Sequence, residues 1–540
     1  MALPAITRSI NHWIAGGSGD DAISFYGIAS NDELLLGDGK DTVNFFSAVI
    51  GGTVDGDAGD DLIVFASSVS KTTLLAGSGR DTLNFAAAVS NATIDAGSDA
   101  DLVRLSADFL SSSLQGGDGN DTLLFSAGIT GATIDAGSDC DSIRVDGILQ
   151  SAMLAAGTGD NADTLILNGA VINSYLRPQS GDDSVSLGSS FVSSTLAASN
   201  GKDTLNIGSI LRTGNNIYLG SDQDLGLFRE VVNGASIRAD ADDDSLPANV
   251  ITANDTLLFN GGVGNSTIKF ECGSDMVRFG ELVAATRILA TATTDLGLSG
   301  ANDTVTFDRV GAGSNIRAGS GADSLLFDQA VTLATIDAGA GVDRLVFQGI
   351  SNGAINAAIS GISSVGEFVS FGSGQVTALF VDATMSSSSI IGGSNQDSLV
   401  FSGSLLFNTI DAGAGSDTLR FNAAFAGPLS GLYGSNELVS FGAGATVAFD
   451  SAIGNGSSVL SGGWRDSLVF KQSIAGATIN AGAGNDTLQC LNVNLNGSSI
   501  AGDIGDDRLD LAVTVGAGGV SFWGGSGNDT FNVAALSSAS

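Results

Sequence analysis

The sequence predicts an all-β solenoid, a parallel β-helix or β-roll with about 20 residues per coil. A phrase Gly-x-Gly-x-Asp followed by alternating apolar residues recurs along the chain, with clear copies at Gly17 to Phe25, Gly37 to Phe45, Gly77 to Phe85 and Gly117 to Phe125. Counted by its closing acid, the phrase occurs 24 times, and 14 of the 23 intervals are 20 residues long. A unit this short can bury an apolar face only against its neighbours, so the units must stack.

The residues after each acid have the pattern of a strand with one buried face. The second residue after the acid is apolar in 23 copies, with Gly226 as the exception, and the fourth is apolar in all 24 and is Phe in 16. Alternation with period 2, together with glycine in every unit, favours strands over helices. A second short strand is expected later in each unit, as at Ala92 to Gly97, Ala132 to Gly137 and Ala334 to Gly339. Each coil should therefore have two strands and two corners.

The spacing of the repeats divides the chain into three parts. We expect a regular solenoid over residues 1–225, irregular coils with inserted loops over 226–302, and a solenoid over 303–540 that continues to an uncapped C-terminal end. Longer intervals between acids predict loops near residues 226–253, 280–299, 348–365, 372–394 and 442–463. Exposed strands at the ends of a stack are sites for edge pairing with another chain.

Composition and charge exclude several classes of partner. The chain has 58 acidic and 21 basic residues and a formal net charge of -37, a field that repels nucleic acid and anionic lipid. Hydrophobic residues make up 43% of the chain, too many for a disordered acidic protein. Cys140, Cys272 and Cys490 are too far apart for a disulfide framework or a zinc cluster. There is no run of about 18 apolar residues and no basic-then-apolar leader, so we expect neither membrane insertion nor an N-terminal signal peptide.

The turns of the repeat carry the chemistry. Glycine can adopt positive φ angles that direct carbonyl oxygens toward a common point, and the closing Asp adds a carboxylate. Ca²⁺ takes about six to eight hard oxygen ligands of this mixed kind. Without a cation, carboxylates one layer apart would repel each other by about 1 kcal/mol or more per close pair. We therefore expect multiple Ca²⁺ ions between adjacent corners.

The repeated turn resembles the nonapeptide Gly-Gly-x-Gly-x-Asp-x-U-x of repeats-in-toxin (RTX), or hemolysin-type, calcium-binding proteins, in which U is a large apolar residue. Gly16 to Ser24, Gly116 to Leu124 and Gly524 to Asn532 match every fixed position, and the resemblance covers nearly the whole chain. It implies that the Asp and the turn carbonyls bind Ca²⁺ between successive coils. The candidate metal-binding positions are Gly17, Gly19, Asp21, Gly37, Gly39, Asp41, Gly59, Asp61, Gly77, Gly79, Asp81, Gly97, Asp99, Asp101, Gly117, Gly119, Asp121, Gly137, Asp139, Asp141, Asp163, Asp183, Asp203, Asp224, Asp303, Gly319, Gly321, Asp323, Gly339, Gly341, Asp343, Gly413, Gly415, Asp417, Gly482, Gly484, Asp486, Asp507, Gly525, Gly527 and Asp529.

The chain departs from the family pattern in two respects. Only one corner of each coil is acidic and glycine-rich, whereas the family often repeats the motif back to back, so a single metal edge is expected. Asp99, Asp139 and Asp222 replace the second Gly, which is acceptable because Asp tolerates the left-handed conformation. Glu367 and Glu437 lie in poorer matches, and their corners are expected to be empty.

The predicted function is structural. We expect an extracellular, Ca²⁺-dependent solenoid that assembles head to tail with copies of itself into a filament or a surface layer (S-layer), with possible lateral contacts. The resemblance implies type I secretion and folding in the millimolar Ca²⁺ found outside the cell. The main alternative is a secreted Ca²⁺-dependent adhesin or glycan-binding module, whose partner would be a cell-surface glycan.

An enzyme is the less favoured class. The chain has a single histidine, His12, and shows neither a Ser-His-Asp arrangement nor an HExxH motif. No catalytic residue and no organic cofactor is expected, although polysaccharide-active β-helix enzymes remain the third alternative. Ice binding would need a regular outward array of Thr and Asn, whereas the outward turn positions vary among residues such as Ser18, Lys40 and Arg80.

Overall fold

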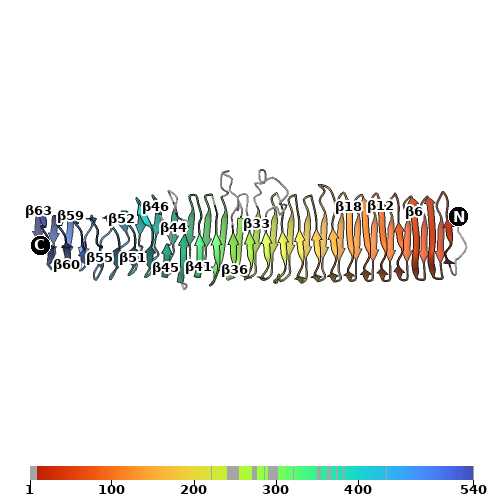
Figure 1. Ribbon diagram of the computed structural model, residues 1–540, viewed down its shortest axis with the longest axis horizontal. Coiled ribbons are helices and arrows are strands. Elements are labelled where there is room, and N and C mark those ends of the chain that lie inside the picture. The colour runs from red at the N-terminus through yellow and green to blue at the C-terminus, as the bar shows by residue number, and fades with distance from the viewer. Residues whose placement is uncertain are drawn as a thin grey trace. The chain divides into compact units, whose positions relative to one another are not determined.

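The computed structural model places the chain in two compact units, Met1–Gly273 and Ser274–Ser540, and each unit is a stack of parallel β-coils (Figure 1). The residues described are 9–220, 222–239, 255–269, 276–284, 286–289, 302–319, 321–348, 354–360, 362, 367–372, 375–380, 384–432 and 434–538. They form strands and turns, and none of them belongs to a helix that could cross a membrane. The all-β parallel solenoid predicted from the sequence is confirmed.

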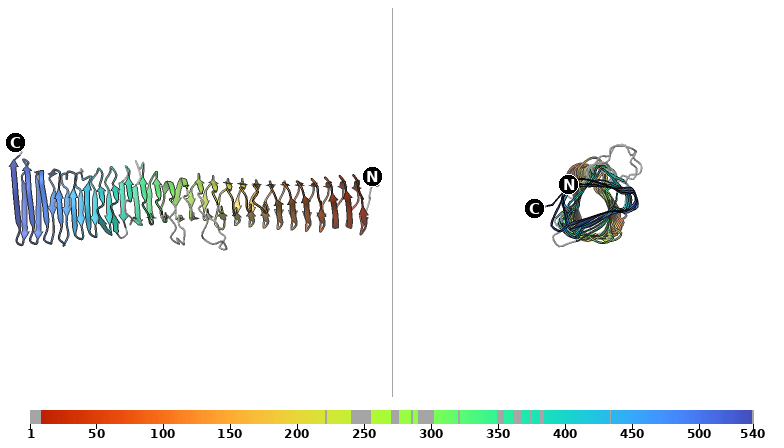
Figure 2. Two further views of the ribbon diagram at one scale, coloured as in Figure 1. Left: turned by 90° about the horizontal axis from the view of Figure 1, so that it is seen from above. Right: turned by 90° about the vertical axis from the view of Figure 1, so that its left-hand side faces the viewer.

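Each regular coil of unit 1 has three strands, and the end-on view shows that the coils are closed in cross-section (Figure 2, right). In one coil these are β10 (Thr82–Phe85), β11 (Val89–Ser90) and β12 (Thr93–Ser98). Every strand pairs in parallel with its equivalent 20 residues further along, so that Leu83 lies beside Val103 and Ile94 beside Leu114. The sequence predicted β10 and β12 but not β11, because a strand of two residues is too short to show a period.

The strand that follows each acid forms one continuous face in unit 1. Its members are β3 (Ala22–Phe25), β5 (Thr42–Phe45), β7 (Leu62–Phe65), β10, β13 (Leu102–Leu105), β16 (Thr122–Phe125), β19 (Ser142–Val145), β22 (Thr164–Leu167), β25 (Ser184–Leu187), β28 (Thr204–Ile207), β30 (Leu225–Phe228) and β33 (Thr256–Phe259). The equivalent strands of unit 2 are β36 (Met276–Ala284), β38 (Thr304–Val310), β40 (Ser324–Phe327), β42 (Arg344–Phe347), β44 (Phe368–Phe371), β48 (Ser398–Phe401), β51 (Thr418–Phe421), β53 (Leu438–Phe441), β56 (Ser467–Phe470), β59 (Thr487–Asn496), β61 (Arg508–Val515) and β63 (Thr530–Ser538).

The core is built from columns of apolar side chains, in which runs of phenylalanine stack on one another. Phe25, Phe45, Phe65 and Phe85 are each no more than 2% exposed. Neighbouring rings in this column stack with centroids 4.6–4.8 Å apart, the spacing that in-register strands impose. The expected alternation is confirmed in most coils, where the apolar residues two and four positions after the acid point inward and the residues between them are mostly partly exposed; Phe531 and Val533 of the last described coil are exposed instead. The fold thus positions the closing acids of unit 1 at the same level of successive coils.

In unit 2 the strand that follows the acid changes face twice. β44 pairs with β42 behind it but with β47 (Ser389–Ile391) ahead of it. The next strand after an acid, β48, pairs instead with β45 (Gln375–Phe380). The same exchange recurs when β53 pairs with β55 (Ser458–Leu460) and β54 (Ala445–Phe449) pairs with β56.

These exchanges correct two of the predicted loops. Segments 372–394 and 442–463 contain the strands β45, β47, β54 and β55 and are part of the stack. The intervals from Glu367 to Asp397 and from Glu437 to Asp466 are close to one and a half repeats, so the additional half coil is built into the wall instead of bulging from it. The predicted loops near 226–253, 280–299 and 348–365 lie partly outside the described residues.

Candidate metal-binding corner

The turn before each closing acid requires residues that tolerate positive φ. Gly77 and Gly79 have φ angles of 110° and 117°, and all other candidate glycines also lie at positive φ. The coils stack so closely here that a Cβ atom on Gly97 would overlap the carbonyl oxygen of Gly77. Asp99 and Asp139, which replace glycine, each have a φ of 76°, as the sequence analysis expected.

The closing acids are buried and form a hydrogen-bonded ladder, here called the acid ladder, in which each acid is a rung. The backbone N–H of Asp101 donates to Oδ1 of Asp121 at 2.7 Å, and the N–H of Asp121 donates to Oδ1 of Asp141 at the same distance. Each rung is therefore tied to the next coil by its own main chain. The rungs of unit 1 are Asp21, Asp41, Asp61, Asp81, Asp101, Asp121, Asp141, Asp163, Asp183, Asp203, Asp224 and Asp255.

The second oxygen of most rungs has no hydrogen-bond donor among the described residues, although it is fully buried. In unit 1 these atoms are Oδ2 of Asp41, Asp61, Asp81, Asp101, Asp121, Asp141, Asp183, Asp203 and Asp224. A buried carboxylate oxygen without a partner is costly, because its ionised form has lost water and gained nothing in return. The ladder thus leaves a column of unsatisfied acceptors inside the turns.

Burial shifts the titration of these acids strongly. The pKa of Asp101 is raised to about 8, mainly by loss of water on burial; the Asp81 N–H lowers it, and the neighbouring carboxylates of Asp81 and Asp121 add to the increase. The same causes raise the pKa of Asp61 to about 7 and that of Asp141 to about 8. In the absence of a counter-charge, the ladder resists full ionisation near neutral pH.

The donor set of this corner fits a hard divalent cation. The described residues contain no cluster of three or more His, Cys, Asp or Glu side chains arranged to hold a metal. Each corner instead offers a buried carboxylate oxygen and the carbonyls of a glycine turn, and two stacked corners offer both sets. Ca²⁺ accepts such mixed oxygen ligands, and it would supply the partner that Oδ2 lacks.

The outer ridge of the corner is already neutralised by the protein. The N–H of Lys40 donates to Oδ1 of Asp20 at 2.9 Å, and the Lys40 ammonium forms an ion pair with Asp60. The N–H of Arg80 donates to Oδ1 of Asp60 at 3.1 Å, and these contacts lower the pKa of Asp60. Around Lys40 and Arg80, the residue before the closing acid therefore links coils from outside, so the candidate site is the inner carboxylate.

A second polar ladder, which the sequence analysis missed, runs along another corner. Ser112 Oγ accepts the N–H of Ala92 at 3.0 Å and donates to the carbonyl of Leu110 at 2.8 Å. The residues before these positions, Asn91 and Ser111, have φ angles of 50° and 48°. The signal in the sequence was a residue that tolerates positive φ about ten positions after each acid. The ladder is uncharged at Ser112 and offers no comparable cation site.

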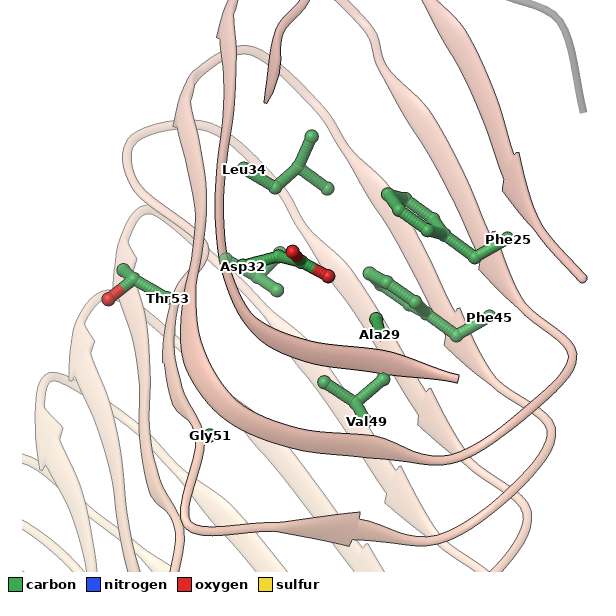
Figure 3. A pocket seen from close by; sticks show the side chains of 9 residues that line it. Phe25, Ala29, Asp32, Leu34, Phe45, Val49, Gly51 and Thr53 are labelled. Atoms are coloured by element: carbon green, nitrogen blue, oxygen red, sulfur yellow. The ribbon is translucent and has the colours of Figure 1, made fainter. Parts of the chain in front are cut away.

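Asp32 is the acidic exception on this second ladder (Figure 3). Its Oδ1 accepts the N–H of His12 at 2.9 Å and its Oδ2 accepts the N–H of Ser30 at 3.1 Å. A cavity of about 10 Å³ beside Phe25 and Phe45 has room for a single water molecule. Both oxygens of Asp32 are satisfied, so this carboxylate does not present the unmet acceptor that marks the acid corner.

Among its described residues, unit 2 holds the remaining candidate acids in three ladders. The first contains Asp303, Asp323, Asp343 and Glu367, the second Asp397, Asp417 and Glu437, and the third Asp466, Asp486, Asp507 and Asp529. Asp163, Asp183, Asp203 and Asp224, which carry weaker forms of the motif, belong to the single ladder of unit 1. The single acidic edge expected from the sequence is present in unit 1, while in unit 2 the ladder changes corner.

Comparison with known proteins gives no family. No protein-family model matches the chain, and no curated protein matches it. Among solved structures, the chain is similar to a hyperactive, Ca²⁺-dependent, β-helical antifreeze protein from an Antarctic bacterium, with 20% identity and a TM-score of 0.32 over 64% of this chain and 86% of that one. It is also similar to a mutant of the PL6 family alginate lyase AlyGC, with 9% identity and a TM-score of 0.22 over 98% and 96% of the two chains. Likenesses at these TM-scores carry no argument about what this chain binds or does.

Proposed function

We propose that this chain is an extracellular structural solenoid of the RTX kind, whose coils are held together by Ca²⁺ ions in the acid corner. The observation that carries the proposal is the buried carboxylate oxygen without a donor on successive rungs, for example Oδ2 of Asp81, Asp101 and Asp121. A cation between rungs would neutralise the carboxylates and give each of these oxygens a partner.

Protonation is the competing way to neutralise the ladder, and calcium concentration decides between the two. Extracellular Ca²⁺ modules bind with dissociation constants of about 10⁻⁴–10⁻³ M, which match Ca²⁺ levels outside the cell. A ligand that binds only the folded chain adds its binding free energy to folding. The chain would remain unfolded in the cytosol, leave by type I secretion, and fold outside.

Assembly with copies of itself is supported by the surface of the last described coil. Phe531, Val533 and Leu536 of β63 pair in register with the buried residues Leu509, Leu511 and Val513 of β61. The three residues of β63 are nevertheless 42%, 49% and 57% exposed. We take a second copy as the occupant of this surface, because a coil of the same chain offers strands of matching spacing and pattern. Repetition of this head-to-tail contact would build a filament or a surface layer.

Calcium titration after stripping with EGTA tests the metal. Circular dichroism should report a gain of β structure between micromolar and millimolar Ca²⁺, and Mg²⁺ at equal ionic strength serves as the control. A chain that is fully folded and equally stable in EGTA and in millimolar Ca²⁺ at pH 8 overturns the proposal.

Light scattering in the same titration tests assembly. The double variant Phe531→Ser/Leu536→Ser should fold with Ca²⁺ but stay monomeric, whereas Leu333→Ser, which changes an apolar residue that is 62% exposed elsewhere on unit 2, should assemble normally. If the unaltered chain stays monomeric in millimolar Ca²⁺ at high protein concentration, the proposed assembly is wrong, whereas the proposed binding of calcium is unaffected.

One observation favours the rival function of a secreted glycan-binding module. Unit 1 has an open groove of about 380 Å³ that is lined by Gly97, Gly117 and Gly137 together with polar residues such as Asp95 and Asp135. A groove lined by glycines and polar side chains can accept an extended hydroxylated ligand. Binding to a glycan array by protein that does not self-assemble would favour this module over the structural role.

A further inference from the structure

The three ladders of unit 2 end and restart in a regular way. The first ladder ends when the N–H of Asp343 donates to Oε2 of Glu367 at 2.8 Å. The next rung at that corner is Ser388, whose carbonyl accepts the N–H of Thr409 and whose own N–H donates to Oδ1 of Asn408 at 2.7 Å. The corner therefore continues with neutral side chains, and that of Asn408 accepts the backbone N–H of the preceding rung as the acids do.

The second ladder ends in the same manner. The N–H of Asp417 donates to Oε2 of Glu437 at 2.6 Å, and the N–H of Glu437 donates to Oγ of Ser457 at 3.1 Å. The third ladder then begins elsewhere on the coil, where Oδ1 of Asp466 accepts the N–H of Ala445 at 2.6 Å. A glutamate thus closes each of the first two ladders, and a serine follows each of these glutamates.

The first acid of each restarted ladder differs from the acids that follow it. Oδ2 of Asp397 accepts the N–H of Gly393 at 2.7 Å, and Oδ2 of Asp466 accepts the hydroxyl of Ser461 at 2.5 Å. Both carboxylates are therefore satisfied by the protein. In contrast, Oδ2 of Asp417, Asp486 and Asp507 and Oε1 of Glu437 are buried without a hydrogen bond of good geometry among the described residues.

We infer that unit 2 carries its ions in three separate short rows on two corners of the coil, in which Asp397 and Asp466 only start a ladder and Glu437 is a ligand that closes one. This inference rests on the proposed function, since it assigns which acids of the same corner hold Ca²⁺. It also extends to Glu437, whose corner was expected to be empty: Glu437 is 2% exposed, and its Oε1 is buried beside the turn residue Gly434 without a hydrogen bond of good geometry. The rows are independent of one another because the rung that follows each glutamate, Ser388 or Ser457, is neutral. A neutral rung supplies no carboxylate to an ion that would bridge two rows.

The sequence explains where a ladder changes corner. The interval from Asp224 to Asp255 is 31 residues, yet the N–H of Asp224 still donates to Oδ1 of Asp255 at 2.9 Å, so this ladder stays in register. At the two changes, the additional half repeat has alternating buried residues, Val376, Ala378 and Phe380 in β45 and Ala445, Val447 and Phe449 in β54. An apolar half repeat becomes another face of the coil and moves the next acid to a different corner.

Terbium luminescence can read one row at a time. Tb³⁺ replaces Ca²⁺ at oxygen sites and emits when a nearby Trp is excited. Trp464 belongs to the turn that ends at Asp466, and Gly484 of the next coil stacks on its carbonyl oxygen. The double variant Trp13→Phe/Trp523→Phe leaves Trp464 as the only Trp and hence as a reporter of the third row.

In this background Asp486→Asn should weaken Trp464-sensitised Tb³⁺ binding at least about tenfold, while Asp417→Asn should leave it within about twofold. Asn keeps the Oδ1 acceptor, and circular dichroism checks that both variants fold. Equilibrium dialysis with Ca²⁺ should show fewer bound ions for Asp417→Asn and Glu437→Gln and an unchanged number for Asp397→Asn. Equal loss of the Trp464 signal in Asp417→Asn and Asp486→Asn, or loss of an ion in Asp397→Asn, overturns the inference. If the unaltered chain binds neither Tb³⁺ nor Ca²⁺, it is the proposed function that fails.

Discussion

Oδ1 of Asp121 accepts the backbone N–H of Asp101 at 2.7 Å, while Oδ2 of the same buried carboxylate has no donor among the described residues. The two oxygens therefore have different tasks. Oδ1 fixes the distance between coils and is used whether or not the acid is charged. Oδ2 can be satisfied only by a proton, water or a cation from solution, and this makes the stability of the stack depend on pH and on Ca²⁺.

Without calcium, the protein should be more stable in mild acid than in base. Burial raises the pKa of Asp61 and Asp183 to about 7 and that of Asp101, Asp141 and Asp203 to about 8, from 3.8. The folded state therefore holds protons that the unfolded state releases, and the resulting stabilisation is lost progressively as pH rises from about 4 to about 8. In EGTA, circular dichroism should show the most folded protein near pH 5, and the β signal should fall toward pH 9.

In millimolar Ca²⁺ the dependence of stability on pH should have the opposite sign. Bound Ca²⁺ needs ionised carboxylates, so protons compete with the metal and stability should increase from pH 5 to pH 8. The same pH dependence with and without Ca²⁺ would show that the ladder is neutralised by protons alone.

Substitution of a single rung should separate the two tasks of the carboxylate. Asp121→Asn keeps an oxygen for the Asp101 N–H but removes the charge, so the variant should be at least as stable as the unaltered chain in EGTA at pH 9. In Ca²⁺ at about 100 times the dissociation constant, it should lack roughly 3 kcal/mol of the calcium-induced gain for each site lost. Thermal unfolding in both buffers measures this difference.

Asp121→Ala is the matched control. It also leaves the buried N–H of Asp101 without an acceptor, which costs about 1–3 kcal/mol with or without metal. If Asp121→Asn and Asp121→Ala behave alike in EGTA, the hydrogen bond to Oδ1 does not contribute as described.

Much of this fold follows from short-range rules that a single sequence displays. The alternation of Leu83 and Phe85 with polar residues predicted the inward face, and the tolerance of Asp for positive φ predicted the conformation of Asp99. The inward burial of the closing acids and the change of corner at Glu367 and Glu437 were not predicted. Both depend on which strand of the next coil stacks on a given strand, and an interval of about one and a half repeats permits either a loop or an additional face.

Two glycines at different corners should respond oppositely to substitution. Gly97 has a φ of 108° and its Cβ would overlap Gly77 of the preceding coil, so Gly97→Ala should cost about 3 kcal/mol or more. Gly131 has a φ of 64°, and the nearest atom to its Cβ would be Ser111 Oγ at 3.6 Å. Because Asn91 holds the equivalent position with a φ of 50°, Gly131→Asn should be neutral or slightly stabilising. Chemical denaturation in Ca²⁺ compares the two variants, and an equal loss in both would contradict the distinction between the corners.

The phenylalanine column should tolerate loss of aromaticity better than loss of volume. Phe65 stacks on Phe45 and Phe85 with centroids 4.8 Å away on both sides, yet further along the same column Leu105 lies in register with Phe85 and Phe125. Phe65→Leu should therefore cost only about 1 kcal/mol, whereas Phe65→Ala leaves a cavity and should cost about 3–5 kcal/mol. Each coil contacts only its neighbours, so the effect should be local. Hydrogen exchange should show faster exchange in β5, β7 and β10 of Phe65→Ala and unchanged exchange in β25. A uniform increase along unit 1 would instead mean that the unit unfolds as a single cooperative block.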